Sequence, residues 1–353
     1  MNKRRMLNEK NLDAFVQDLI NAGTRVISPI RRKEQGRETA TYAAVQNPEE
    51  ILLAGPQPAL PLKDVVFPPT ETLFNWKQVK SSIRIKENPE GFKKTVVIGA
   101  RPCDAAAMEI VDRVMGWDYR DELWFGRRQA TTVLAVACSQ CDDACFCTAV
   151  GLSPTNARGA DCFLTPGEGG FEVETLTSKG EELLESHHGR FTQAKDPAKT
   201  QPAELENKVR ANLSLQPEKI QQWLERHFDD PLWKQLALRC HGCGACAFIC
   251  PTCHCFDIVD EPGGIDCGRR RRNWDACQPA LFTMHGSGHN PRKDQTARFR
   301  QRIMHKFNIY PARFGEILCT GCGRCVRVCA AGMDLVSILG EISYMAEEAG
   351  STS

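Results

Sequence analysis

The chain has 353 residues, of which 42% are hydrophobic, so it is long enough for two compact domains and too ordinary in composition for a disordered or fibrous protein. Its 45 lysines and arginines nearly balance its 44 aspartates and glutamates, and a net charge of +1 gives no overall field that would draw it onto nucleic acid or an anionic membrane. Any charged docking surface must therefore be local.

The first residues do not have the pattern of a secretion signal. Polar residues between Asn8 and Asp13 interrupt the stretch that a signal peptide needs to be apolar. No run of about 18 apolar residues appears anywhere, so we expect no membrane insertion and a cytoplasmic protein. Eighteen cysteines in such a protein indicate metal binding, whereas in a secreted protein they would indicate disulfides.

Residues 1–190 alternate short apolar runs with stretches of helical spacing, which is typical of an α/β domain. In chain order, the pattern predicts a helix over residues 12–22 and a strand over residues 25–29. Weaker strand signals follow at residues 52–54 and 65–67.

Two stronger strand signals, residues 95–100 and 131–137, each lead directly into a loop that contains cysteine. Both runs are almost wholly apolar, as expected for strands that are covered on both faces of a sheet. Loops that leave the same end of such a sheet commonly build the binding site. We therefore expect the two loops to bring Cys103 and Cys138 together.

A polar segment, residues 191–217, is predicted to link the α/β domain to a second domain over residues 218–345, with residues 346–353 as a tail. Residues 218–228 and 232–239 have apolar positions at helical spacing. Helices therefore lead into the cysteine motif that follows.

The second domain contains the cysteine motif C-x2-C-x2-C-x3-C twice. Three thiolates at this spacing wrap one face of a 4Fe-4S cubane, and in two-cluster proteins the fourth cysteine of each run binds the other cluster. We therefore assign one cluster to Cys240, Cys243, Cys246 and Cys329, and the other to Cys319, Cys322, Cys325 and Cys250. Zinc would need only two separated C-x2-C pairs, so the doubled motif favours iron–sulfur over zinc.

The connection between the two motifs is long: 68 residues (251–318) separate Cys250 from Cys319, and they include a helical pattern at residues 294–307. We therefore expect an α/β N-terminal domain followed by a mainly helical two-cluster ferredoxin-like domain. Ala330 stands where the first motif has Pro251. Proline shapes this loop without binding iron, so its loss leaves the set of ligands unchanged.

The N-terminal loops are candidates for a third 4Fe-4S cluster. Four thiols are expected to converge at the strand ends, namely Cys103, Cys138, Cys145 and Cys147. Cys141 is a competing ligand, and Cys162 lies farther along the chain. The alternative is that these cysteines serve as small buried apolar residues.

More cysteines surround the first motif. Cys253 and Cys255 follow it directly, and Cys267 and Cys277 lie in the connection. Cys253, Cys255 and Cys277 are candidates for a further metal site, with His254 beside them, or for S–H contacts that adjust the first cluster.

Two polar features have weaker functional interpretations. His285 and His289 are four residues apart, but Gly286 and Gly288 disfavour a helix, so we expect the histidines to structure a loop and not to bind zinc. The basic run 269–272 is either a solvated face or a docking site for an acidic partner or phosphate, with nucleic acid as the least favoured ligand.

An ordered set of segments between residues 95 and 335 resembles a known family. The segments are GARPCDAAAMEIVDRV, CFCTAVGLSP with GADCFLT after it, CGACAFICPTCHCFDIV, NWDACQPALFTMHGSGHNPR and FGEILCTGCGRCVRVC. The family comprises the iron–sulfur beta subunits of cytoplasmic NAD(P)-linked nickel–iron hydrogenases (sulfhydrogenases), the corresponding iron–sulfur subunit of anaerobic sulfite reductase, and that of flavin oxidoreductases linked to heterodisulfide reductase.

The resemblance carries over to particular cysteines. By motif it implies a third site at Cys103, Cys145 and Cys147, with Cys138 upstream. The chain departs from the family pattern at Ala330 and at the extra cysteines, which are Cys141, Cys162 and Cys267.

What the resemblance implies is a non-catalytic electron-transfer subunit of an oxidoreductase complex in anaerobic metabolism. Such a subunit relays single electrons between a flavin partner that reacts with NAD(P)H and a catalytic redox subunit of the hydrogenase, sulfite reductase or heterodisulfide reductase type. No G-x-G-x-x-G follows a predicted strand, so we expect FAD and NAD(P) on the partner. The alternatives are a catalytic oxidoreductase site in the N-terminal domain, or a zinc-bearing nucleic-acid module.

Overall fold

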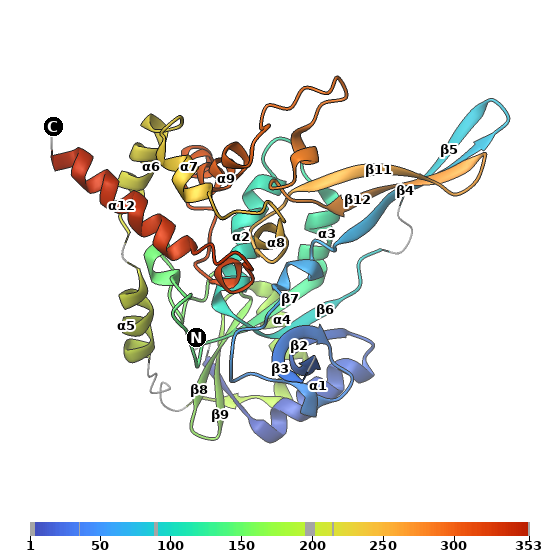
Figure 1. Ribbon diagram of the computed structural model, residues 1–353. Helices are drawn as coiled ribbons and strands as arrows, with labels where there is room; N and C mark the ends of the chain where they lie inside the picture. The colour runs from blue at the N-terminus through green and yellow to red at the C-terminus, as the bar shows by residue number, and fades with distance from the viewer. Residues whose placement is uncertain (1–3, 35, 88–90, 195–201, 214, 352–353) are drawn as a thin grey trace.

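The computed structural model describes residues 4–34, 36–87, 91–194, 202–213 and 215–351 (Figure 1). Its larger sheet contains β1 (Arg4–Asn8), β2 (Arg25–Glu34), β3 (Arg37–Ala44), β6 (Thr95–Ala100), β7 (Thr131–Val136), β8 (Cys162–Gly167), β9 (Gly170–Thr175) and β10 (Thr192–Gln193). The strand order is β10-β1-β9-β8-β7-β6-β2-β3. The central strands β2, β6, β7 and β8 are parallel to one another, and the outer strands pair antiparallel.

Helices cover both faces of this sheet, because neighbouring residues of a strand face opposite sides. On one face, Val97 of β6 shares a core with α2 (Pro102–Met115) and α3 (Glu122–Ala130). On the other face, residues of α1 (Glu9–Asn21) and α4 (Ser178–Ser186) form the core with Val96 and Ile98. Burial on both sides explains why β6 is almost wholly apolar.

Most of the elements predicted for this region are present. The predicted strands over residues 95–100 and 131–137 are β6 and β7, and the predicted helix over residues 12–22 is α1. The weaker strand predictions are wrong. Val65 is the last residue of a short 3-10 helix, Leu62–Val65, residues 66–67 form the turn after it, and residues 52–54 are loop.

A second, antiparallel sheet projects from the body as a long ribbon (Figure 1). Its strands are β4 (Thr70–Val79), β5 (Ser82–Glu87), β11 (Phe256–Pro262) and β12 (Cys267–Trp274), in the order β11-β12-β4-β5. Two of these strands come from the first predicted domain and two from the second, so β4 and β12 join the two halves of the chain along a shared ladder. The predicted linker between the two domains, residues 191–217, and the predicted start of the tail at residue 346 stay predictions.

The C-terminal half is held by a helical core. The helices of this half are α5 (Pro202–Asn212), α6 (Pro217–Arg226), α7 (Leu232–Ala237), α8 (Ala245–Phe248), α9 (Gln295–Met304), α10 (Tyr310–Phe314), α11 (Arg324–Arg327) and α12 (Leu335–Ser351). Trp223, Trp233 and Leu339 are buried together in this core. The expected mainly helical domain is found only in part, because β11 and β12 add strands that the charged, weakly periodic sequence did not indicate. Within the described residues, no helix combines the length and the apolar character needed to cross a membrane.

Candidate iron–sulfur sites

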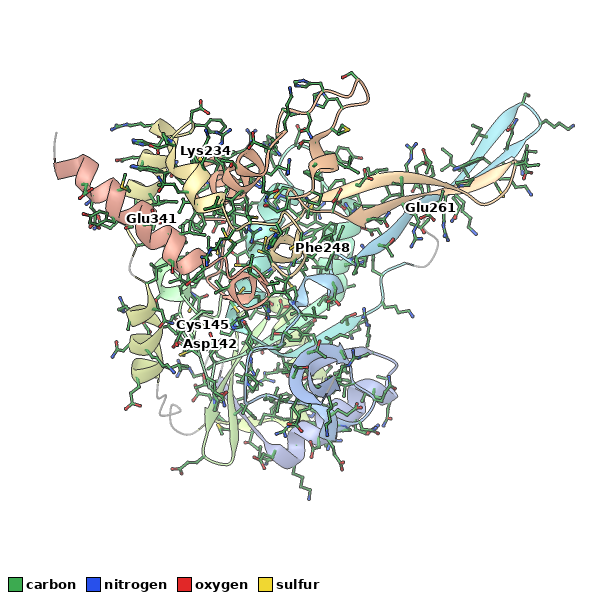
Figure 2. The ribbon with its side chains drawn as sticks, in the orientation of Figure 1. Asp142, Cys145, Lys234, Phe248, Glu261 and Glu341 are labelled. Atoms are coloured by element: carbon green, nitrogen blue, oxygen red, sulfur yellow. The ribbon has the colours of Figure 1, made fainter. Side chains whose placement is uncertain are left out.

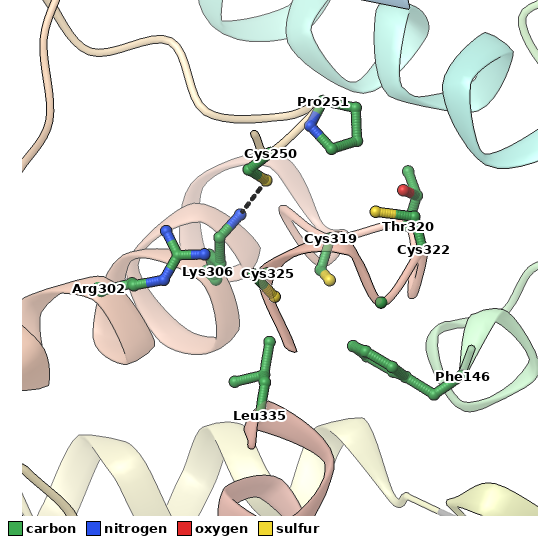
Figure 3. Close-up of a pocket in the computed structure, with 11 residues that line it drawn as sticks. Phe146, Cys250, Pro251, Arg302, Lys306, Cys319, Thr320, Cys322, Cys325 and Leu335 are labelled. Atoms are coloured by element: carbon green, nitrogen blue, oxygen red, sulfur yellow. Dashed lines mark hydrogen bonds between the residues drawn. The ribbon is translucent and has the colours of Figure 1, made fainter. Parts of the chain in front are cut away.

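The two cysteine motifs line two neighbouring cavities. The first site is a cavity of about 160 Å³ whose walls include Cys240, Cys243, Cys246 and Cys329. The second site is a smaller cavity whose walls include Cys319, Cys322, Cys325 and Cys250 (Figure 3). Each cavity thus contains three cysteines of one motif and the last cysteine of the other, as in two-cluster ferredoxins, and Cys325 lines both cavities. This grouping supports the predicted ligand sets, which stay predictions.

Glycines in the second motif allow its loop to lie directly on another cysteine loop. Gly323 has a φ of 72° and directly precedes the short helix α11. A Cβ atom on Gly323 would lie 2.3 Å from the carbonyl oxygen of Ala144, so any side chain there would clash with backbone. The amide of Phe146 also donates to the carbonyl of Gly321 at 2.8 Å. The second motif and the loop around Phe146 therefore contact backbone to backbone.

A third cavity, here called the N-terminal site, lies where β6 and β7 end. Its walls include Cys103, Cys138, Cys145 and Cys147, together with the competing candidate Cys141. Cys162 is part of the sheet core and lies in β8. The structure therefore brings the predicted loops together around one cavity, and the choice among the five thiols stays a prediction.

Backbone geometry directs the first of these loops. Gly99 has a φ of 84°, and the ladder between β6 and β7 shifts register there. Such a bulge bends the strand and redirects the residues that follow. Cys103 consequently lies in the first turn of α2, facing the N-terminal site.

A buried ion pair joins the N-terminal site to the second site. Arg324 donates two hydrogen bonds, of 2.6 and 2.7 Å, to the two carboxylate oxygens of Asp104. The hydroxyl of Tyr42 donates to the same carboxylate at 2.8 Å. Asp104 follows Cys103 in sequence, and Arg324 lies between Cys322 and Cys325 of the second motif. This bidentate pair therefore fixes the two cysteine loops relative to each other.

Two buried cations lie against the second site. The ammonium group of Lys306 is 3.3 Å from the sulfur of Cys250 and donates to the carbonyl of Leu318 at 2.7 Å (Figure 3). Lys306 lies in a π-helical turn, His305–Ile309, that continues α9. Arg302 is 3.5 Å from the sulfur of Cys253 and donates to the carbonyl of Cys246 at 2.9 Å. Within the part of the chain that the structure describes, neither cation forms an ion pair with a carboxylate.

These cations provide a test of whether an iron–sulfur cluster fits the cavities. A buried cation requires a nearby anion. Lys306 and Arg302 are 2% and 6% exposed, and besides carbonyl and hydroxyl oxygens the groups that they contact are the thiols of Cys250 and Cys253. Their positive charge complements the net negative charge of a cubane bound by four thiolates. The donors and the charges present therefore fit two 4Fe-4S clusters.

Burial raises the pKa of most thiols at both neighbouring sites, to about 11 for Cys319 and about 12 for Cys325 at the second site, and Cys250 is the exception. At the second site, a hydrogen bond with Cys253 and the charge of Lys306 lower the pKa of Cys250, although burial acts in the opposite direction. At the N-terminal site, burial raises the pKa values of Cys138 and Cys147 to about 12. Iron binds thiolates, so loading the N-terminal site must release protons.

The N-terminal site also has a cation, but at the surface. The guanidinium group of Arg327 is 3.2 Å from the sulfur of Cys145 and 2.6 Å from a carboxylate oxygen of Asp142. Asp142 and Cys145 lie close together on one loop (Figure 2). The side chain of Asn212, at the end of α5, donates to the carbonyls of both residues.

The remaining candidates lie apart from the three cavities. Cys267 is on the projecting ribbon, opposite Lys77. His285 and His289 have ring centroids 5.3 Å apart in an exposed loop. Among the described residues, no group of three or more His, Cys, Asp or Glu side chains is arranged to hold a single metal ion. The ligands of a cubane bind four different irons. The absence of a single-ion site among the described residues therefore says nothing about clusters.

The basic run 269–272 is paired along the ribbon. Arg269 and Arg271 contact Glu261, and Arg270 contacts Asp260. Arg272 is buried against Glu71 and Asp121. Acidic partners on the same molecule therefore offset the charge that a phosphate or nucleic-acid site would need.

Comparison with known proteins identifies the cysteine-rich region. A family model described as a 4Fe-4S dicluster domain matches residues 239–333. The chain contains a 4Fe-4S dicluster domain. It is also 29% identical over 321 residues to the beta subunit of sulfhydrogenase 2 from Pyrococcus furiosus, a match that covers 90% of this chain and 92% of that protein. The two findings are consistent with the iron–sulfur beta subunit family, and the resemblance inferred from the motifs is confirmed.

The sequence analysis of this iron–sulfur protein missed the charged residues beside the cysteines. They are Asp104, Arg302, Lys306, Arg324 and Arg327. Asp104 and Arg324 carry a signal in the sequence, because each is a charged residue directly next to a predicted ligand, Cys103 and Cys325 respectively. Lys306 and Arg302 carry none, since a cation on an amphipathic helix normally faces solvent.

Proposed function

We propose that this iron–sulfur subunit relays single electrons along three 4Fe-4S clusters, one in the N-terminal site, one in the second site and one in the first site. The reaction is a reversible one-electron change at iron, and it forms no covalent bond to a substrate. The protein holds each cluster, excludes water and sets its potential through charge and hydrogen bonds.

The observation that carries the proposal is that the three cavities adjoin in series. Cys322 lines both the N-terminal site and the second site. Cys325 and Leu335 line both the second site and the first site. The second site therefore lies between the other two, with Phe146 and the loop of residues 320–323 packed between it and the N-terminal site.

The two ends of this series lie nearer to the surface than its middle. Cys243 of the first site is exposed, and Cys145 of the N-terminal site is partly exposed. Three thiols of the second site are buried. Electrons would accordingly enter at one end and leave at the other, and partners would dock near Cys243 and near Cys145.

The similarity to a sulfhydrogenase beta subunit supports a hetero-oligomer. At one end of the relay we place a flavin subunit that reacts with NAD(P)H, and at the other end a catalytic redox subunit, within the cytoplasm. FAD and NAD(P) would belong to the flavin partner. This chain would contribute electron transfer alone.

The test is a reductive titration of the anaerobically purified chain. With dithionite, the chain is expected to accept about three electrons, one for each cluster. NADPH alone is expected to reduce none of them, and NADPH with a separate flavin reductase is expected to reduce them all. Bound flavin in the isolated chain, or direct reduction by NADPH, would contradict the relay and favour a catalytic site in the N-terminal domain.

A further inference from the structure

The amide side chain of Gln295 donates to a predicted ligand of the first cluster. Its Nε2 is 3.3 Å from the sulfur of Cys240. The carboxylate of Asp294 caps α9 by accepting from the amide of Ala297 at 2.8 Å, so Gln295 is the first residue of that helix. Gly242, with a φ of 69°, leaves room for this side chain, because a Cβ atom there would overlap Oε1 of Gln295. The first motif and α9 therefore pack against each other beside Cys240.

A buried arginine determines which end of this amide faces the sulfur. Arg298 is 9% exposed, and its guanidinium donates to Oε1 of Gln295 at 2.9 Å and to the carbonyl of Gln278 at 2.8 Å. A guanidinium can only donate, so the oxygen of Gln295 must face Arg298 and its N–H groups must face Cys240. Arg298 thus sets the direction of the N–H···S contact.

A second glutamine holds the other N–H of Gln295. Nε2 of Gln295 donates to Oε1 of Gln278 at 3.2 Å, and Nε2 of Gln278 donates to the carbonyl of Arg298 at 3.0 Å. Gln278 is 1% exposed and lines the first site. The two amide groups are therefore held in one orientation beside the sulfur of Cys240.

Iron binding changes what the sulfur of Cys240 can do. As a thiol, Cys240 can donate, and its sulfur lies 3.8 Å from Oε1 of Gln278. Iron binds the thiolate, which can only accept hydrogen bonds. Gln295 is then the donor that the thiolate faces. Among the described residues, no other side chain donates to a sulfur of the first site.

We propose that Gln295 raises the reduction potential of the first cluster by donating an N–H···S hydrogen bond to Cys240. The proposal rests on the relay proposed above, because the hydrogen bond can set a potential only if a cluster is bound at the first site. Reduction adds negative charge that the thiolates share, so a donor to one of them stabilises the reduced state more than the oxidised state. Gln295 would thus ease electron transfer at the end of the relay where Cys243 is exposed.

The test compares two replacements of Gln295 in the anaerobically purified full chain. Gln295→Met removes the donor with little change in size. The potential of the first cluster should fall by about three- to tenfold in the one-electron equilibrium, and tenfold corresponds to about 59 mV. Gln295→Glu keeps an oxygen that accepts from Arg298 but turns a carboxylate oxygen toward Cys240, so it should lower the potential at least as far.

Potentiometric titration followed by EPR measures both shifts, and the signal of the first cluster is the one that disappears in Cys243→Ala. Gln301→Glu is the matched control, because it makes the same charge change on α9 at a residue that does not line the first site. Its shift should be smaller than that of Gln295→Glu. All three glutamine variants should retain the iron of the unmodified chain.

Three results would overturn the proposal. A lowered potential in Gln295→Met with the original potential in Gln295→Glu would mean that Gln295 acts only by holding Arg298. Equal shifts in Gln295→Glu and Gln301→Glu, or no shift at residue 295, would exclude a contact that acts on the sulfur. Loss of about four irons in both Gln295 variants would make the residue structural. These results leave the relay standing, whereas an unmodified chain without iron would remove the relay itself.

Discussion

The second site and the N-terminal site offer the same kind of candidate ligand, the cysteine thiol, in different electrostatic settings. At the second site, Lys306 is 2% exposed and lies 3.3 Å from the sulfur of Cys250. At the N-terminal site, Arg327 contacts Cys145 but is partly exposed and paired with Asp142. Water and the paired carboxylate screen the charge of Arg327, whereas burial leaves that of Lys306 unscreened.

This contrast predicts the order of the reduction potentials of the clusters proposed for the two sites. Reduction adds negative charge to a cluster, and a nearby unscreened cation stabilises that charge. A cluster in the second site should therefore be reduced before one in the N-terminal site. The buried middle of the proposed relay would then be its electron reservoir, and the placement of cations, more than the choice of ligands, would set the order of reduction.

The largest effect should come from removing a ligand of the second site. Cys319→Ser is expected to lower the iron content from about twelve to about eight per chain, because a cubane needs four thiolates. Iron analysis and reduced-state EPR measure the loss. Cys267→Ser, on the ribbon, is the control and should retain all the iron. Unchanged iron in Cys319→Ser would remove that cysteine from the ligand set.

Breaking the buried ion pair between the two sites should come next. Asp104→Asn leaves Arg324, which is 2% exposed, without a carboxylate and is expected to destabilise the protein by about 3–5 kcal/mol. Asp142→Asn removes the partner of Arg327 at the surface and should cost about 0–1 kcal/mol. The thermal midpoints of the two variants measure the difference. Equal losses would mean that the pair does not hold the loops together.

A smaller effect is expected on the potential of the second cluster. Lys306→Met removes the buried charge beside Cys250 and should lower that potential by about 59 mV or more, which is a tenfold change in a one-electron equilibrium. A potentiometric titration followed by EPR measures the shift. Lys306→Arg keeps the charge and should retain most of the original value. An equal fall in the reduction potential in Lys306→Met and Lys306→Arg would indicate a packing effect instead of an effect of charge.

The smallest effect should come from Arg327→Gln at the N-terminal site. Because the charge of Arg327 is screened, the potential of the N-terminal cluster should fall by less than that of the second cluster in Lys306→Met. The same titration gives both values, and raising the ionic strength should reduce only the effect of Arg327. A larger shift at the N-terminal site would reverse the contrast.

Much of this architecture could be predicted from apolar runs and cysteine spacing. β6 and β7 are apolar because both faces of the sheet are covered, so they were clear in the sequence. The spacing of the two motifs gave the cysteine sets that line the first and second sites, because cubane geometry dictates that spacing.

The ribbon and the buried charges could not be predicted in this way. β5 alternates two isoleucines with charged residues but is exposed along its whole length, so it has no buried face, and β12 contains four consecutive arginines instead of the apolar alternation of a half-buried strand. Their pairing depends on residues about 200 positions apart, such as Arg272 and Glu71. The burial of Lys306 likewise depends on tertiary contacts with Cys250 and Leu318, which no local pattern records.

The measurement that tests the central claim most directly is the iron and acid-labile sulfide content of the anaerobically purified chain, with EPR of the reduced state. Three clusters in series predict about twelve of each per chain and spin coupling between neighbouring clusters. About eight of each would confine the relay to the first and second sites and would contradict a cluster at Cys103, Cys138, Cys145 and Cys147.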